Sequence, residues 1–376
     1  MVEWKELGSL GRFENIGTDK KIIEGEEIVT LLNYVDVYRH KYIDSSVPQM
    51  QVSASKKKIE DCTVEKGDIF VTPSSETVDD IGHSSVITDT IPNAVYSYHI
   101  MRYRLYEKNM LLSYYINYAF DTDIVKKQIL KKAQGLTRFG LSKDKFASIT
   151  IPIPSLEEQT RIVGILDTFT SAIDNLKEQI AQRRKQYEYY RDQLLDLEGK
   201  PGVVMKTLGE ICDITAGGDV PKGNFNAEKT DDYSIPIISN GIGDKAIYGY
   251  TNIIKINRPS VTISARGTIG YAEYRDYPFY PIIRLITASP KNTETKVKYL
   301  YYLLSKQKYN VSKSGIPQLT VPNIKVIQIP VPSLQEQQRI VSILDTFEAS
   351  IQNLEEQLKL REKQYEYYRN KLLTFE

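Results

Sequence analysis

The sequence contains few cysteines and histidines. It has two cysteines, Cys62 and Cys212, and three histidines among 376 residues. Two distant cysteines cannot form a disulfide framework, and they fit a reducing compartment. The histidines, at positions 40, 83 and 99, are too scattered to supply the clustered nitrogen ligands of a zinc site. We therefore expect neither a metal site nor a fold held by disulfides.

Long apolar segments are also lacking. No stretch approaches the roughly 18 consecutive apolar residues that a membrane-spanning helix requires. The N-terminal sequence MVEWKELGSLGRF does not have the basic-then-apolar order of a secretion signal. The sequence therefore predicts a cytoplasmic protein that makes no membrane contact.

Neither sign of charge prevails over the whole chain. The chain has 49 lysines and arginines and 48 aspartates and glutamates, which gives a net charge of +1. Residues 200–328, however, contain 17 basic and 10 acidic side chains, whereas residues 151–199 contain 6 and 9. A basic segment in a neutral chain is compatible with nucleic-acid contact. Because solvated lysines are common on protein surfaces, this charge marks a candidate region and no more.

One long segment occurs twice. Residues 151–195 read IPIPSLEEQTRIVGILDTFTSAIDNLKEQIAQRRKQYEYYRDQLL, and residues 329–373 read IPVPSLQEQQRIVSILDTFEASIQNLEEQLKLREKQYEYYRNKLL. The constant offset is 178 residues, and 30 of the 45 aligned positions are identical. Each copy begins with a capping-box pattern, S-x-x-E, at Ser155 and Ser333, which is typical of a helix start. Such an ungapped repeat indicates two copies of one helical element.

Apolar residues recur along each copy with alternating spacings of four and three, which is typical of a coiled coil. In the first copy this seam runs through Ile162, Leu166, Phe169, Ile173, Leu176, Ile180, Tyr187, Tyr190 and Leu194, and the second copy repeats it. One seam position is an arginine in each copy, Arg183 and Arg361, so it either reaches solvent or makes a specific contact. We expect the two helices to pair antiparallel; the alternative is that each packs only on its own head.

The remaining segments each precede one helix copy and share an outline. Short runs rich in Ile, Val, Tyr and Thr, broken by Gly, Asn, Asp and Pro, predict β-strands. We expect strands near 26–37, 67–72, 85–88 and 94–106 in the first head, and near 233–239, 245–250, 260–265, 268–275 and 279–288 in the second. A helix should follow in each, at 108–133 and 294–308, and then a glycine-containing loop, from Gln134 and from Lys313.

The expected fold class is therefore α+β, with two pseudo-twofold-related heads separated by a long antiparallel coiled coil. The expected order is a first head at 1–150, a spacer helix at 151–198, a second head at 199–328 and a second spacer helix at 329–376. Near-identical helices that carry two different heads indicate a common scaffold with two distinct specificities.

Motifs for catalysis and cofactors are lacking. We find no D/N-P-P-Y/F motif for amino-group methylation and no G-x-x-x-x-G-K-S/T loop for ATP. Gly241-Ile242-Gly243 lacks the surrounding strand–turn–helix unit of a nucleotide site, so we interpret it as a turn. The acidic pairs Glu26-Glu27 and Asp79-Asp80 have no lysine in register, and we interpret them as solvated loops. The sequence predicts no catalytic residue and no bound cofactor.

The layout and the motif P-S-L-x-E-Q-x-x-I-V-x-x-L-D, at 154–167 and 332–345, resemble the specificity subunits of Type I restriction–modification enzymes. The resemblance covers the whole chain in organisation, but in sequence only the helical segments carry it. It implies a non-catalytic subunit whose two target-recognition domains read the two parts of a bipartite, asymmetric site in double-stranded DNA. It also implies that two methyltransferase subunits dock on the helices and that restriction (motor) subunits join them. S-adenosylmethionine and ATP would then belong to those partners.

Polar and basic residues in the loops of the two heads are candidates for DNA contact, because they can reach phosphates and base edges. The candidates in the first head are Lys56, Lys57, Lys58, Ser74, Ser75, Thr77, Thr137 and Arg138. Those in the second head are Lys222, Asn224, Ser239, Asn240, Ser264, Arg266, Thr268, Gln318 and Thr320. Any one of them alone could be an ordinary surface residue.

Identical polar residues at the helix starts are candidates for partner docking, because solvent exposure alone does not demand identity. They are Glu158, Gln159 and Arg161 in the first copy and Glu336, Gln337 and Arg339 in the second. Two other functions remain open. One is a structural adaptor whose coiled coil joins proteins, which salt-sensitive DNA binding would exclude. The other is an enzyme with a fused catalytic site, against which the missing motifs argue.

Overall fold

The computed structural model describes residues 2–309 and 317–375. By compactness the chain forms two units, one made of residues 1–177 with 357–376 and the other of residues 178–356. Each unit thus combines one head with half of each long helix. This division differs from the linear order of heads and helices that the repeat indicates, because each helix belongs partly to both units. We describe the two units separately.

The first unit contains a five-stranded sheet in the order β2-β10-β6-β8-β4 and a three-stranded sheet in the order β5-β3-β9. Two-stranded ribbons join β1 to β12 and β7 to β11. The strands are β1 (Glu3–Glu6), β2 (Gly11–Glu14), β3 (Glu27–Leu32), β4 (Tyr42–Ile43), β5 (Met50–Ala54), β6 (Ile69–Val71), β7 (Ser74–Ser75), β8 (Ser84–Ile87), β9 (Ala94–Tyr96), β10 (Met101–Leu105), β11 (Phe139–Gly140) and β12 (Thr150–Ile153). The helices are α1 (Leu7–Leu10), α2 (Tyr34–Arg39), α3 (Lys56–Asp61), η1 (Val78–Asp80), α4 (Met110–Phe120), α5 (Asp123–Lys132) and α6 (Lys143–Ala147).

The second unit repeats this topology with fewer elements. Its sheets have the orders β14-β20-β17-β18 and β16-β15-β19, and β13 pairs with β21. The strands are β13 (Val204–Thr207), β14 (Cys212–Ala216), β15 (Ile235–Ile238), β16 (Ile247–Thr251), β17 (Ser260–Ser264), β18 (Ala272–Arg275), β19 (Tyr280–Pro281), β20 (Leu285–Pro290) and β21 (Gln328–Val331). The helices are α8 (Leu208–Ile211), η2 (Gly243–Ala246), α9 (Val297–Lys306) and α10 (Val321–Lys325). The long helices are α7 (Leu156–Leu195) and α11 (Leu334–Thr374).

Most predicted strands are present, but four predicted segments are broken, two by polar caps and two by tight turns. The strand expected at 26–37 ends at Leu32, because Asn33 and Asp36 form a capping box that starts α2. The helix expected at 108–133 is two helices, since the Thr122 side chain caps α5. The strand expected at 94–106 is β9 and β10, separated by a tight turn at 97–100. The strand expected at 279–288 is β19 and β20, separated by a turn at 282–284. Part of the second glycine-containing loop, residues 313–316, lies outside the described residues.

The long helices pair antiparallel within each unit, as expected. In the first unit the rings of Phe169 and Tyr368 stack with centroids 5.5 Å apart. In the second unit the equivalent rings, Phe347 and Tyr190, stack at the same distance. The seam arginines make a specific contact, because each guanidinium lies about 6 Å from the centroid of one of these phenylalanine rings, at 5.9 Å for Arg183 and 5.8 Å for Arg361.

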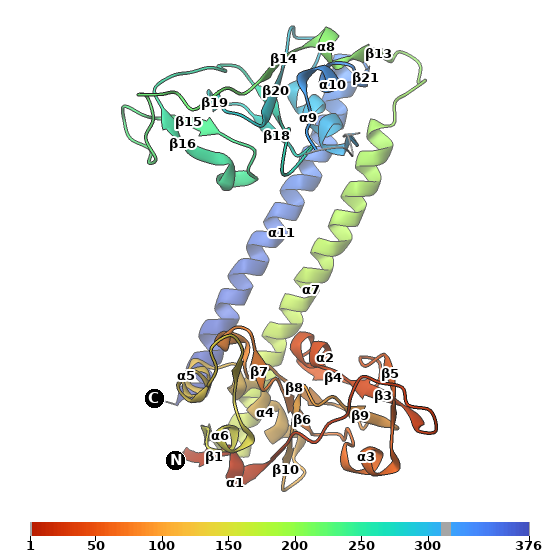
Figure 1. The fold of residues 1–376 in the computed structure, drawn as a ribbon, viewed down its shortest axis with the longest axis vertical. Helices are drawn as coiled ribbons and strands as arrows, with labels where there is room; N and C mark the ends of the chain where they lie inside the picture. The colour runs from red at the N-terminus through yellow and green to blue at the C-terminus, as the bar shows by residue number, and fades with distance from the viewer. Residues whose placement is uncertain (1, 310–316, 376) are drawn as a thin grey trace. The chain divides into compact units, whose positions relative to one another are not determined.

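Each head also packs on both helices of its unit. The first core contains Ile162, Val163 and Leu166 from α7 together with Leu373 from α11. The second core contains the residues equivalent to these, Ile340, Val341, Leu344 and Leu195. In Figure 1, α4 and α5 accordingly lie against the start of α7 and the end of α11. The helices therefore pair with each other and support the heads, and the expected α+β class with two similar heads and antiparallel long helices is confirmed.

Two tyrosines on one helix of each head fasten it to the repeated segment. Tyr115 donates to the Pro152 carbonyl at 2.8 Å, and Tyr118 donates to the Asp167 carboxylate at 2.5 Å. In the second unit Tyr299 donates to the Pro330 carbonyl at 2.9 Å, and Tyr302 donates to Asp345 at 2.6 Å. These four contacts explain why the repeated motif ends in Asp: the carboxylate accepts the hydroxyl of a buried tyrosine.

We predict that Tyr118→Phe and Tyr302→Phe each lower the free energy of unfolding by about 1.5–3 kcal/mol, because each removes a hydrogen bond to a charged acceptor. Urea unfolding followed by circular dichroism measures this change. Tyr106→Phe is a matched control, since its ring is 64% exposed. If the two variants have the same free energy of unfolding as the control, the tyrosine–aspartate contacts do not stabilise the heads.

Candidate nucleic-acid interface

Three loops converge at one edge of each head, and we call this set the loop edge. In the first unit it comprises residues 73–77, 97–100 and 137–141, and in the second unit residues 264–268, 282–285 and 317–320. The same backbone hydrogen bond joins two of the loops in both units. Leu141 N donates to the Pro73 carbonyl at 2.9 Å, and Leu319 N donates to the Ala265 carbonyl at 2.8 Å. The two heads therefore build equivalent edges from divergent sequences.

The loop edge of the first unit brings together two of the three predicted groups. Ser74 and Ser75 form β7, which pairs with β11 beside Arg138. The Arg138 guanidinium donates to the Ser74 hydroxyl at 3.3 Å, and Thr77 donates to Asp80 at 2.6 Å. Arg138 and Thr137 are exposed. A basic side chain and several hydroxyls thus face solvent together, as contact with phosphates and base edges requires.

The lysine group of the first head lies elsewhere, on α3. Lys56 and Lys57 are exposed at its start. Lys58 instead binds its own chain, since its ammonium donates to the carbonyls of Ile16 and Gly17. Tyr98 on the loop edge borders this region, because it lines one hollow with Lys58 and another with Ser74. Lys56 and Lys57 are therefore the available cations of this group.

Sequence reasoning missed Tyr98 and His99, which occupy the turn before β10. Tyr98 is 48% exposed, and its ring lies 4.0 Å from that of His99. Burial, together with the charges of Lys20 and Arg138, lowers the pKa of His99, so the imidazole is neutral near pH 7. An exposed aromatic ring beside cations is a surface that suits nucleic acid. The sequence Tyr-Ser-Tyr-His before a strand was the available signal.

The loop edge of the second unit brings together three predicted groups. Asn240 donates from its side chain to the Arg266 carbonyl at 2.6 Å, and its own carbonyl accepts from Thr268 at 2.9 Å and from Ser264 at 3.3 Å. Ser264 is buried, so it shapes the turn and does not face solvent. The Leu319 contact places the third loop, with the exposed Gln318 and Thr320, beside the same turn.

The other predicted residues of the second head have local roles. Thr320 caps α10 in a capping box with Asn323, and the Ser239 hydroxyl donates to the Ala246 carbonyl at 3.1 Å. Lys222 and Asn224 belong to a turn after Pro221, where Asn224 N donates to the Pro221 carbonyl at 3.2 Å. The described contacts do not join Lys222 or Asn224 to the loop edge.

Arg284 is a second arginine on this edge that sequence reasoning missed. Its carbonyl accepts from Ala265 N at 2.8 Å, which joins its turn to the turn of Arg266, and its side chain is exposed. Its backbone has a φ of 73°, in the left-handed region that an arginine rarely adopts. Strained backbone of this kind is concentrated at functional sites. Arg284 occupies the turn equivalent to that of His99, so the two heads place different side chains, a cation and a neutral imidazole, at the same turn.

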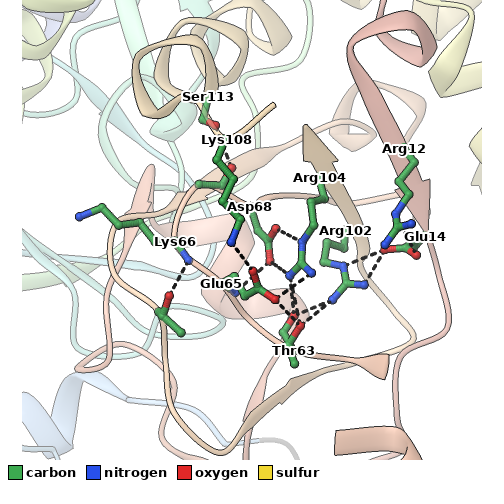
Figure 2. Close-up of polar contacts among 12 residues, drawn as sticks. Arg12, Glu14, Thr63, Glu65, Lys66, Asp68, Arg102, Arg104, Lys108 and Ser113 are labelled. Carbon is green, nitrogen blue, oxygen red and sulfur yellow. Dashed lines mark hydrogen bonds and ion pairs between the residues drawn. The ribbon is translucent and has the colours of Figure 1, made fainter. Parts of the chain in front are cut away.

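The largest polar cluster of the first head has a different role (Figure 2). Arg102 donates to Glu14 at 3.0 Å and to the Thr63 carbonyl at 2.7 Å, and Arg104 donates to Asp68 at 2.6 Å. Burial raises the pKa of Asp68 although the Arg104 guanidinium opposes this shift. The charged groups satisfy one another and tie residues 61–68 to β10. Within residues 2–309 and 317–375, no group of three or more potential metal ligands comes together.

The predicted docking residues divide into exposed and buried ones. Arg161 forms a bidentate ion pair with Glu158, at 2.7 and 2.6 Å, and Arg339 pairs with Glu336 at 2.8 and 2.7 Å. Gln159 and Gln337 are instead 6% and 0% exposed. Their side chains donate to the carbonyls of Pro154 and Pro332, both at 3.0 Å. The recurrence of the glutamines therefore has a structural explanation, and we remove them from the docking surface.

Each exposed ion pair lies near an exposed leucine that sequence reasoning missed. Leu156 is 60% exposed and Leu334, at the equivalent position, is 46% exposed. An exposed apolar side chain repeated at both helix starts is a better docking candidate than polar identity alone; because it lies two residues before the glutamate of the ion pair, it projects from a different side of the helix. The signal was the invariant leucine of the repeated P-S-L sequence.

The helices of the described residues include none long and apolar enough to cross a membrane.

Comparison with known proteins gives consistent matches. A family model described as "Type I restriction modification DNA specificity domain" matches residues 1–183 and again residues 201–361. A putative type I specificity subunit of Mycoplasma pneumoniae is 35% identical over 243 residues, which are 62% of this chain and 66% of that protein. The chain thus matches about two thirds of that relative's length. A second one from the same bacterium is 34% identical over 279 residues, which are 69% of this chain and 83% of that protein.

Solved structures support the fold. The crystal structure of a Type I restriction–modification S subunit from M. genitalium has a TM-score of 0.62 at 18% identity, and the alignment covers 100% of this chain and 97% of that one. At this identity the match shows a shared fold. The heads of the present chain therefore have a known architecture, and their loop sequences are their own.

We predict that Arg284→Gly is more stable than Arg284→Ala by about 1 kcal/mol, because only glycine relieves the left-handed backbone. Both variants remove the guanidinium, so both should bind DNA equally weakly. Urea unfolding measures the first effect and a fluorescence binding assay with duplex DNA measures the second. Equal stability of the two variants would show that the turn is unstrained, and wild-type binding by both would show that Arg284 makes no DNA contact.

Proposed function

The chain belongs to the Type I restriction–modification DNA specificity family, and on this premise we propose that each head reads one part of a bipartite, asymmetric site in double-stranded DNA. The observation that carries the proposal is the loop edge, which recurs in both heads with the same backbone hydrogen bond but with different side chains. Loop edges with the same backbone geometry but different side chains would allow the two heads to recognise two different DNA sequences.

Within each head we assign two kinds of contact. Exposed cations such as Lys56, Lys57 and Arg138 neutralise phosphates, which fixes the position of the head without reading bases. Arg266 and Gln318, on adjacent loops of the second head, can reach base edges. An arginine that binds guanine does so through two hydrogen bonds in the major groove. Base reading in the first head falls to the Ser74–Thr77 loop and the turn at Tyr98 and His99.

We further propose that this chain supplies specificity and its partners supply catalysis. Two methyltransferase subunits would dock at the two helix starts, one of which carries Leu156, Glu158 and Arg161 and the other Leu334, Glu336 and Arg339. Restriction (motor) subunits would join that complex. Two equivalent docking surfaces on one chain fit two copies of one partner, because the same partner surface can bind each.

We predict that DNA binding by the assembled methyltransferase depends steeply on salt. If about 6–10 phosphates are neutralised, the logarithm of the affinity falls with the logarithm of salt concentration at a slope near −5 to −9. Arg266→Ala should weaken binding by about 1–3 kcal/mol and relax the preference at one base. Arg12→Ala, on β2 and away from the loop edge, is the matched control.

Binding to a randomised duplex library measures both effects. A slope near zero would exclude the phosphate contacts and would favour a protein adaptor over a DNA reader. Equal weakening by Arg266→Ala at every base position would show that Arg266 contacts only phosphate.

We predict that reversing both ion pairs, as Glu158→Arg with Arg161→Glu and Glu336→Arg with Arg339→Glu, abolishes co-purification of the methyltransferase subunit. Each exchange keeps a local ion pair, so the helix starts should remain folded, but it inverts the charges presented beside Leu156 and Leu334. Glu188→Arg with Glu366→Arg, at exposed repeated positions further along the helices, serves as the control. If the exchanged variant still co-purifies at the wild-type level, docking occurs elsewhere.

A further inference from the structure

The apolar seam is nearly identical in the two long helices, so it does not determine which helix pairs with which. Of the ten seam positions, nine are identical in the two copies, and the tenth is Ile180 in one and Leu358 in the other. The stacked rings and the arginine contacts are also the same in both units. By its seam alone, α7 could therefore pair with the α7 of a second chain as well as with α11. Whatever selects the partner must lie at positions where the copies differ.

The sign of the charge reverses at only two of the 45 aligned positions. Lys177 in the first copy corresponds to Glu355 in the second, and Arg184 corresponds to Glu362. These two positions are the ones that bind each other across the helix pair. Lys177 pairs with Glu362 at 3.6 Å in the first unit, and Arg184 pairs with Glu355 at 2.5 Å in the second. Each reversed charge therefore lies opposite a charge of the other sign, so both pairs are attractive.

Pairing of like helices would turn every one of these contacts repulsive. In the register that the seam fixes, two α7 helices would place Lys177 against Arg184 twice, and two α11 helices would place Glu355 against Glu362 twice. We infer that these four side chains make the helical surface selective, so that it accepts a helix of the opposite copy and rejects a second helix of its own kind. The partner that each surface fits is a helix with the complementary pair of charges.

This selectivity has a physical use during folding. The first helix copy is complete 178 residues before the second, and until then its apolar seam has no partner on the same chain. Two nascent or partly folded chains could meet through this seam, because exposed apolar surface drives association. Repulsion between Lys177 and Arg184 opposes that encounter and leaves the surface open for α11.

The charges also predict the salt dependence of the effect. The four side chains are 42–61% exposed, so each contact is weak, but pairing of like helices exchanges two attractions for two repulsions. Contacts of this kind together shift a pairing equilibrium on the order of tenfold. At about 1 M salt the Debye length falls to about 3 Å, and the discrimination should largely disappear.

Two variants of the full chain separate selectivity from stability. Arg184→Glu with Glu355→Arg keeps both attractions within the chain, but it also makes like helices attractive; we call it the permissive variant. The second variant, Lys177→Glu, Arg184→Glu, Glu355→Lys and Glu362→Arg, inverts all four charges. It keeps the attractions within the chain and keeps like helices repulsive, so it is the matched control.

The experiment refolds each full chain from urea as an equal mixture of unlabelled and ¹⁵N-labelled protein. A lysine cross-linker and mass spectrometry then measure links between two chains at Lys185 or at Lys363, which no variant changes. We expect the permissive variant to show on the order of ten times more cross-chain links of like helices than the wild type or the control. At about 1 M salt, the cross-chain linkage of the wild type should rise towards that of the permissive variant.

Two results would overturn the inference. Equal cross-chain linkage in all three proteins would show that the four charges do not select the partner. A wild-type linkage that stays low at about 1 M salt would show that selection does not arise from charge, and this second test needs no variant.

Discussion

The fold of each unit depends on how a head is fixed to the repeated helix. A carboxylate at the end of the repeated motif, Asp167 or Asp345, accepts a hydrogen bond from a buried tyrosine of the head. Within five residues of it, Ile162, Val163 and Leu166, or their equivalents, enter the core of the same head. Because this junction is identical in both units, the rest of each head is free to differ. A common junction is what allows two unrelated surfaces to be presented by one scaffold.

The freedom to differ is used at the loop edges. The backbone contacts that join the loops do not depend on side chains. Leu141 and Pro73 in one unit therefore form the same hydrogen bond as Leu319 and Ala265 in the other. The side chains at the edges differ: hydroxyls with Arg138 and His99 in one head, and two arginines with Gln318 in the other. A fixed backbone with variable side chains is a physical basis for distinct DNA specificities.

Sequence alone predicted the long helices, their antiparallel pairing and the α+β heads, because the repeat and its heptad spacing are strong local signals. It misjudged the segments at 26–37, 94–106, 108–133 and 279–288, where single polar caps or tight turns override apolar runs. Three of the predicted contact residues, Arg138, Arg266 and Gln318, lie on loops of the loop edges, and their contact with DNA stays a prediction.

Sequence reasoning missed Arg284 and His99, because only the tertiary hydrogen bonds and charges around the turns place them at the loop edge. It also misjudged Gln159 and Gln337. Burial, which no local pattern reveals, directs their side chains to their own backbone.

We propose that the two heads read two separate parts of one DNA site. The most direct test is a genome-wide map of methylated adenines in cells that carry the wild-type gene, no gene, or the gene with Arg266→Ala and Arg284→Ala. We expect the wild type to give one split, asymmetric motif that disappears without the gene. The variant should lose base preference in one part and keep the other part unchanged. A motif that is continuous, or that changes in both parts at once, would contradict the account.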